Sequence, residues 1–139
     1  MQTGLSRALY DSNVTMLVGE SGAGKTGWAL RISQYQREQG RSVLYLSNEM
    51  TTEELVSYGV RLNLQLGFTL REMDPDLSLS ELLLQNIVRN QYVVLDNIIL
   101  QGNRGIGSLS RTISSLVNEH NMHFMLIHHT YKSNIQDYG

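Results

Sequence analysis

Four short apolar runs constrain the fold of this 139-residue chain more than any other feature. They cover residues 14–18, 43–46, 92–95 and 124–127. Each run is continuous rather than alternating in polarity, which is typical of strands that are covered on both faces. Segments with helical periodicity separate the runs, and strands that alternate with helices favour a mostly parallel sheet with right-handed crossovers. We therefore predict a three-layer α/β fold with helices on both faces of the sheet.

The segments between these runs carry helix signals. The first contains Ala29 and Ile32 on one face and stops at Gly40, a residue that favours helix ends. The second opens with the capping-box spacing of Thr51 and Glu54. The predicted helices cover residues 25–39, 51–66, 83–88 and 108–119, and the segments REMDPD (71–76) and GNRGIG (102–107) are expected to be loops.

Composition narrows the class of protein. A chain of this length with 41% hydrophobic residues is expected to form a single domain, residues 1–139. The formal net charge of -2 gives no global attraction to nucleic acid, so any such contact must come from local basic loops. The chain has no cysteine, which suits a reducing compartment. No segment resembles a signal peptide or approaches the roughly 20 apolar residues of a membrane span, so we expect a soluble, cytoplasmic protein with no membrane contact.

The segment GESGAGKT connects the first apolar run to the first predicted helix. Its spacing of Gly19, four residues and then Gly24, Lys25 and Thr26 fits the phosphate-binding loop pattern, although a glycine-rich turn with a chance lysine is the alternative. Lys25 is expected to reach the β- and γ-phosphates of ATP, and the hydroxyl of Thr26 to bind Mg²⁺. The predicted nucleotide-binding residues are Gly19, Glu20, Ser21, Gly22, Ala23, Gly24, Lys25 and Thr26.

Polar residues follow the other three apolar runs. Ligands of open α/β sheets collect at the carboxyl ends of the strands, so these residues are the candidates for chemistry. Asp96 is predicted to hold Mg²⁺, Glu49 to activate the water that attacks the γ-phosphate, and His129 to sense that phosphate. The alternatives are a turn-capping aspartate, a solvated glutamate before a helix, and a histidine packed at a strand end.

These segments resemble the RecA-like ATPases, and among them the hexameric replicative helicases of the DnaB type and their RepA-like plasmid and phage relatives. GESGAGKTGWAL resembles their first motif, VLYLSNEMTTEEL their strand-Glu-Met-helix segment, YVVLDNIIL their second motif, and MLIHHTYKS a segment with a His-His-Thr-x-Lys pattern. The resemblance spans residues 14–133. It implies an ATPase that uses ATP and Mg²⁺ and a core strand order of 1-4-3-2. The implied catalytic residues are Lys25, Glu49 and His129, and the implied metal ligands are Thr26 and Asp96.

The resemblance also implies an oligomer, either a ring or a filament, with a polymer on the loops after the third and fourth strands. Arg104, Tyr131 and Lys132 lie in these segments and are the predicted contacts to single-stranded DNA. A basic residue on a glycine-rich loop can follow a phosphate backbone, and a tyrosine can stack on a base. Family members continue past the sensor strand, so a sequence that ends at Gly139 is expected to be a truncated or minimal relative.

The function expected from these features is that of an ATP-hydrolysing domain of a DNA helicase, translocase or recombination ATPase. Two alternatives stay open. One is a nucleotide-gated assembly factor or regulator with little turnover. The other is a small nucleotide kinase, for which Arg61 and Arg71 are available but no lid segment is evident.

Overall fold

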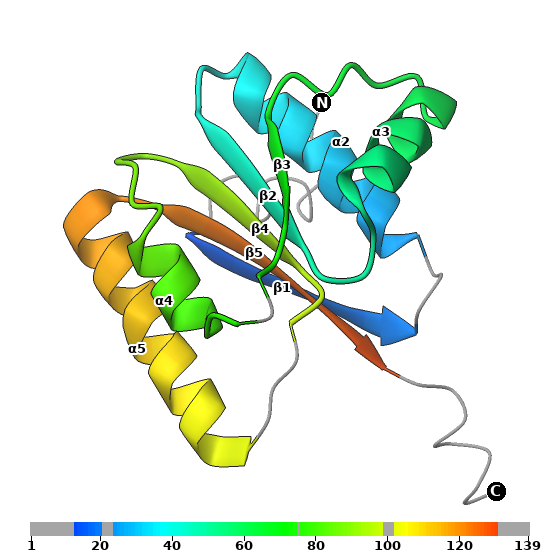
Figure 1. Cartoon of the computed structure of the whole chain (residues 1–139). Coiled ribbons are helices and arrows are strands. Elements are labelled where there is room, and N and C mark those ends of the chain that lie inside the picture. Colours follow the sequence, from blue (N-terminus) through cyan, green and yellow to red (C-terminus); the bar gives the residue numbers. More distant parts are fainter. Residues whose placement is uncertain (1–12, 21–23, 75, 99–101, 131–139) are drawn as a thin grey trace, which may run out of the picture.

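The computed structural model of the protein describes residues 13–20, 24–74, 76–98 and 102–130. Strands and helices alternate along the chain, and every strand pair is parallel (Figure 1). The elements are β1 (Val14–Glu20), α2 (Lys25–Glu38), β2 (Val43–Ser47), α3 (Thr52–Arg61), β3 (Thr69–Glu72), α4 (Leu79–Leu84), β4 (Tyr92–Asp96), α5 (Gly102–His120) and β5 (His123–Thr130). The expected α/β architecture with a parallel sheet is confirmed.

The sheet has five strands in the order β1-β5-β4-β2-β3, which differs from the expected order 1-4-3-2 by one added strand. The four strands read from the apolar runs keep their expected neighbours, and β3 pairs with β2 at the edge. Residues 71 and 72, which were expected in a loop, belong to this strand. An edge strand with mostly exposed side chains does not need a continuous apolar run, and for that reason the pattern missed it.

The two central strands are buried along their whole length, as their continuous apolar runs predict. The same prediction is wrong for β1, which lies at an edge of the sheet and alternates between exposed and partly buried residues. Successive side chains of a strand point to opposite faces, so β2 supplies both layers of the core. Leu44 and Leu46 pack in the cluster that includes α4 and α5, whereas Val43 and Tyr45 pack in the cluster that includes α2 and α3. Helices therefore cover both faces of the sheet (Figure 1).

Helix boundaries differ from the prediction in ways that local chemistry explains. Thr51 caps α3 in the expected capping box with Glu54, but the helix ends at Arg61 because Asn63 adopts a left-handed conformation with φ 59°. Helix α4 begins at Leu79, earlier than expected, directly after its N-cap residue Ser78.

The segment GNRGIG is not the expected loop, because α5 begins at Gly102. Each glycine costs a helix about 1 kcal/mol relative to alanine. Extending an existing helix avoids the cost of nucleation, and the later turns of α5 are anchored in the core by Leu109, Ile113 and Leu116. The helix can therefore run through a segment whose composition favours a turn.

All five strands point the same way, so their carboxyl ends meet at one edge of the sheet (Figure 1). The register pairs Gly19 with His129 and Ser47 with Asp96. These pairings bring the residues that follow each strand into one neighbourhood. Among the helices in the described part of the chain, none has the length and apolar character needed to cross a membrane.

Candidate functional site

The loop between β1 and α2 joins a strand to a helix, as its glycine spacing predicts. Gly24, the N-cap of α2, has φ 84°, a left-handed conformation that favours glycine. Lys25 is buried, and its ammonium donates a hydrogen bond to the main-chain oxygen of Glu20. A Cβ at Gly19 would lie 3.3 Å from the Lys25 Nζ atom, so the ammonium sits directly over the strand end. Residues 21–23 of the predicted loop lie outside the described residues.

Asp96 ends β4 with only 1% of its surface exposed. Its Oδ2 atom accepts hydrogen bonds from the Thr26 hydroxyl at 3.1 Å and from the Tyr45 hydroxyl at 2.5 Å. Its Oδ1 atom has no hydrogen-bond partner in the described part of the chain. Although Oδ1 lies 3.4 Å from His129 Nε2, it makes no hydrogen bond to that atom and can accept a further ligand. A carboxylate oxygen beside a hydroxyl suits a hard divalent cation. Thr26 and Asp96 therefore fit Mg²⁺.

Tyr45 donates to the same oxygen of Asp96 as Thr26 and was not predicted as a site residue. Burial, and to a smaller degree the charge and hydrogen bond of Asp96, raise the pKa of Tyr45 well above its ordinary value of 10.0. The hydroxyl therefore stays protonated at neutral pH and donates to Asp96. The available signal in the sequence was a tyrosine inside a run predicted to be fully buried, because a buried phenol needs a partner.

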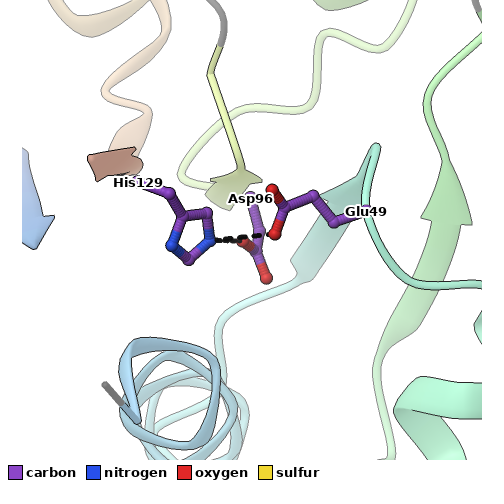
Figure 2. A group of neighbouring side chains, drawn as sticks. All are labelled: Glu49, Asp96 and His129. Atoms are coloured by element: carbon purple, nitrogen blue, oxygen red, sulfur yellow. Dashed lines mark ion pairs between the residues drawn. The ribbon is translucent and has the colours of Figure 1, made fainter. Parts of the chain in front are cut away.

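Glu49 and His129 meet beside Asp96, and Figure 2 shows the imidazole directed at both carboxylates. The Nε2 atom of His129 lies 3.1 Å from Glu49 Oε2 and 3.4 Å from Asp96 Oδ1. One ligand-type atom from each of the three residues lies within 4.8 Å of the others. His129 is buried, whereas the side chain of Glu49 is 35% exposed and is therefore open to solvent.

Asn97 is a second residue that the prediction missed. It follows Asp96 directly, is buried, and donates a hydrogen bond from Nδ2 to Glu49 Oε1 at 2.9 Å. Position after the acidic residue was the only available hint, because the contact depends on how β2 and β4 pair. His128, the neighbour of His129, places its Nδ1 atom 3.2 Å from the main-chain oxygen of Ile98 and contributes to packing at the strand end.

A cavity of about 550 Å³ lies beside Lys25, Glu49 and His129. Its lining includes the start of α2, the loop after β2 and the end of β5, and consists of Gly24, Lys25, Thr26, Glu49, Met50, Tyr58 and His129. This volume lies in the usual range for small-molecule sites. Predicted site residues from three separate parts of the chain thus border one space, and Met50 and Tyr58, which were not predicted, complete its lining.

The predicted polymer-binding residues do not lie as expected. Arg104 belongs to α5 and not to a loop, because that helix begins at Gly102. Its side chain is outside the described part of the structure, as are Tyr131 and Lys132 in full. Their role in DNA binding remains a prediction.

We compared the chain with known proteins, and the match among solved structures agrees with the observed fold. No family model matches the chain, and no curated protein sequence matches it. Among solved structures, the ATPase domain of G40P is similar, with a TM-score of 0.62 at 12% sequence identity. The match covers 89% of this chain and 59% of that one, so the chain spans about three fifths of its structural neighbour. At this identity the likeness concerns the fold alone, which is an α/β fold with a parallel sheet.

Proposed function

We propose that the chain is a RecA-like domain that binds ATP with Mg²⁺ and hydrolyses it. The observation that carries this proposal is that predicted groups from three strand ends border one cavity, and that Asp96 at a fourth strand end contacts two of them, Thr26 and His129. Lys25 and Thr26 follow β1, Glu49 follows β2, Asp96 ends β4, and His129 lies near the end of β5. A fold shared with a domain that is named an ATPase domain supports the same assignment.

The phosphate groups would be held by Lys25 and by the main chain at the start of α2. In the structure the Lys25 ammonium is satisfied by a neutral main-chain oxygen. A triphosphate offers charged oxygens, which are stronger acceptors, so the ammonium is expected to exchange its partner when ATP binds. The N-terminus of α2 adds main-chain N–H donors and positive partial charge.

Thr26 and Asp96 would hold the metal ion, and Tyr45 would fix Asp96 through Oδ2, the same carboxylate oxygen that Thr26 contacts. When bound, Mg²⁺ would supply positive charge that offsets the negative charge that develops in phosphoryl transfer.

Glu49 would act as the general base. Its carboxylate borders the same cavity as Lys25 and is partly exposed, so a water molecule can reach it. The water oxygen forms a bond to the γ-phosphorus while the bond to the β–γ bridging oxygen breaks, and Glu49 accepts the proton of the water. The products are ADP and phosphate. His129 lies beside Glu49 and would contact the γ-phosphate.

The proposal is tested by ATP turnover of the wild type and of Glu49→Gln. The variant keeps the shape of the side chain but lacks the base, so we expect turnover to fall about a hundredfold or more while ATP still binds. Normal turnover by Glu49→Gln would move the catalytic role to another residue. A wild type that binds ATP without turnover would favour a nucleotide-gated regulator, and phosphorylation of an added nucleoside would indicate a kinase.

The finer part of the proposal is an oligomer, a ring or filament, that acts on single-stranded DNA. Its support is the sequence resemblance over residues 14–133, with Arg104, Tyr131 and Lys132 as the expected contacts. A few basic residues bind weakly, so an oligomer that multiplies them is part of the proposal. Stimulation of turnover by single-stranded DNA, weakened by salt, is the expected result. Turnover that DNA leaves unchanged would remove this part and leave the ATPase assignment standing.

A further inference from the structure

Asn97 is buried, with an exposed fraction of 4%, and makes three hydrogen bonds. These bonds connect the ends of β4, β2 and β5. Its Nδ2 atom donates to Glu49 Oε1 at 2.9 Å, and its Oδ1 atom accepts from the main-chain N–H of His129 at 3.1 Å. Its own main-chain N–H donates to Asn48 Oδ1 at 3.1 Å. One side chain thus contacts the loop after β2 and the end of β5 at the same time.

We infer that Asn97 is a positioning residue that holds the Glu49 carboxylate in its working orientation and couples it to His129. This inference rests on the proposed ATPase function. Glu49 lies on a loop and is partly exposed, so its flexible side chain needs a fixed partner to keep one orientation. The amide of Asn97 binds Oε1 and leaves Oε2 on the side of His129.

The coupling to His129 follows from the second end of the same amide. The main chain of His129 donates to Oδ1 of Asn97, while the imidazole of His129 lies 3.1 Å from Glu49. A movement of the end of β5 on loss of the γ-phosphate would therefore shift the amide and, through it, the carboxylate. A neutral amide suits this position because it is a donor toward the carboxylate and an acceptor toward the main chain.

Asn97→Asp separates these two contacts. The new carboxylate has nearly the same shape and still accepts the N–H of His129, but it cannot donate to Glu49 and it places a like charge beside it. We expect kcat for ATP to fall roughly ten- to a hundredfold, the size that follows from misplacing a reacting group. The KM for ATP should stay within about twofold, because Lys25 and Thr26 are unchanged.

The decisive measurement is a double-mutant cycle of Asn97→Asp and Glu49→Gln. The rate of hydrolysis of each protein is measured under single-turnover conditions with single-stranded DNA present. If Asn97 acts through Glu49, Asn97→Asp should change the residual rate of the Glu49→Gln protein by less than about twofold. The matched control is Asn121→Asp, which removes the Nδ2 donor of an exposed 2.8 Å hydrogen bond to Asn90 beyond the other end of β5. The control should leave both kinetic constants unchanged.

Asn97→Ala is the second variant in case the aspartate prevents folding. It removes both side-chain contacts without adding charge and should also lower kcat with little change in KM. Equal losses of rate with and without Glu49 would overturn the inference, since Asn97 would then act on the structure in general. Wild-type kcat in Asn97→Asp or Asn97→Ala would overturn it as well. A wild type without ATP turnover would instead overturn the proposed function, and this inference with it.

Discussion

The two ends of the sheet carry polar residues that differ in how they are satisfied. At the amino end, Asn121 donates to Asn90 at 2.8 Å, and both residues form exposed turns with positive φ angles of 51° and 66°. At the carboxyl end, Asp96 and His129 are buried, and each has a side-chain atom without a hydrogen-bond partner in the described part of the chain. Turn chemistry explains the first group, whereas it does not explain the second, at which we propose that a ligand binds.

Polarity at a strand end is therefore a weak signal of a ligand site until both the burial of the side chain and its partners are known. His123 begins β5 and His129 lies near its end, and both are buried. His123 has an interaction partner and lies 3.5 Å from the Asn13 side chain at the amino end. His129 instead faces two acids and borders the cavity. The predictions below compare changes at the carboxyl end with matched changes elsewhere.

The largest expected effect is that of Lys25→Ala on nucleotide affinity. The variant removes the buried ammonium that is proposed to contact the β- and γ-phosphates. Loss of charge-assisted hydrogen bonds should weaken binding about a hundredfold or more. Titration with a fluorescent ATP analogue measures the change. An affinity equal to that of the wild type would show that the nucleotide lies elsewhere or does not bind.

A smaller effect is expected from Asp96→Asn on the requirement for Mg²⁺. The amide keeps the shape of the side chain but loses the negative charge that favours a divalent cation. The Mg²⁺ concentration for half-maximal turnover should rise about tenfold, corresponding to roughly 1.4 kcal/mol. Asp76→Asn removes a charge from an exposed position and should leave the Mg²⁺ dependence unchanged. Equal curves for wild type and Asp96→Asn would contradict the metal assignment.

Tyr45→Phe should act on stability and on its pH dependence. Removing the hydroxyl takes one donor from Asp96, which should lower the free energy of unfolding by about 1 kcal/mol at neutral pH. The pKa of Tyr45 is raised in the folded state, so folding favours the protonated phenol. That stabilisation is fully present below the ordinary value of 10.0 and is lost as pH rises through the folded-state pKa.

The wild type should therefore lose stability above about pH 10, and Tyr45→Phe should lose less over the same range. Urea unfolding across alkaline pH, with a chelator and without nucleotide, measures both slopes. Parallel slopes for the two proteins would contradict the role of this phenol.

The smallest effect on function is expected at the amino end. Asn121→Ala removes the bond to Asn90 and places alanine at φ 51°, so the free energy of unfolding should fall by about 1 to 2 kcal/mol. Turnover and nucleotide affinity should not change. A loss of activity in this folded variant would break the distinction between the two ends.

Much of the fold was readable from the sequence because its central strands are buried on both faces. β2 and β4 require continuous apolar runs, and these runs predicted them. The edge strand β3 has no such requirement, and the glycine-containing start of α5 is helical only because the rest of the helix is anchored in the core. The runs therefore predicted where four strands lie, but the burial of β1 on both faces was predicted wrongly, because the sequence does not show that β1 lies at the sheet edge. Features that depend on neighbouring elements were not predicted.

The candidate site also contains some residues that the sequence predicted and others that it did not. The residues directly after strands were predicted because parallel strands bring their carboxyl ends together. Tyr45 and Asn97 were missed because their contacts depend on the register that sets Ser47 against Asp96. That register decides which side chains of β2 and its following loop face the acid, and a single sequence does not contain it.

The most direct test of the account is a crystal structure of the protein with Mg²⁺ and a non-hydrolysable ATP analogue. We expect the triphosphate to lie along Lys25 and the start of α2, with the metal beside Thr26 and Asp96 and the γ-phosphate facing Glu49. A nucleotide bound away from this cavity, or a metal held without Thr26 and Asp96, would contradict it.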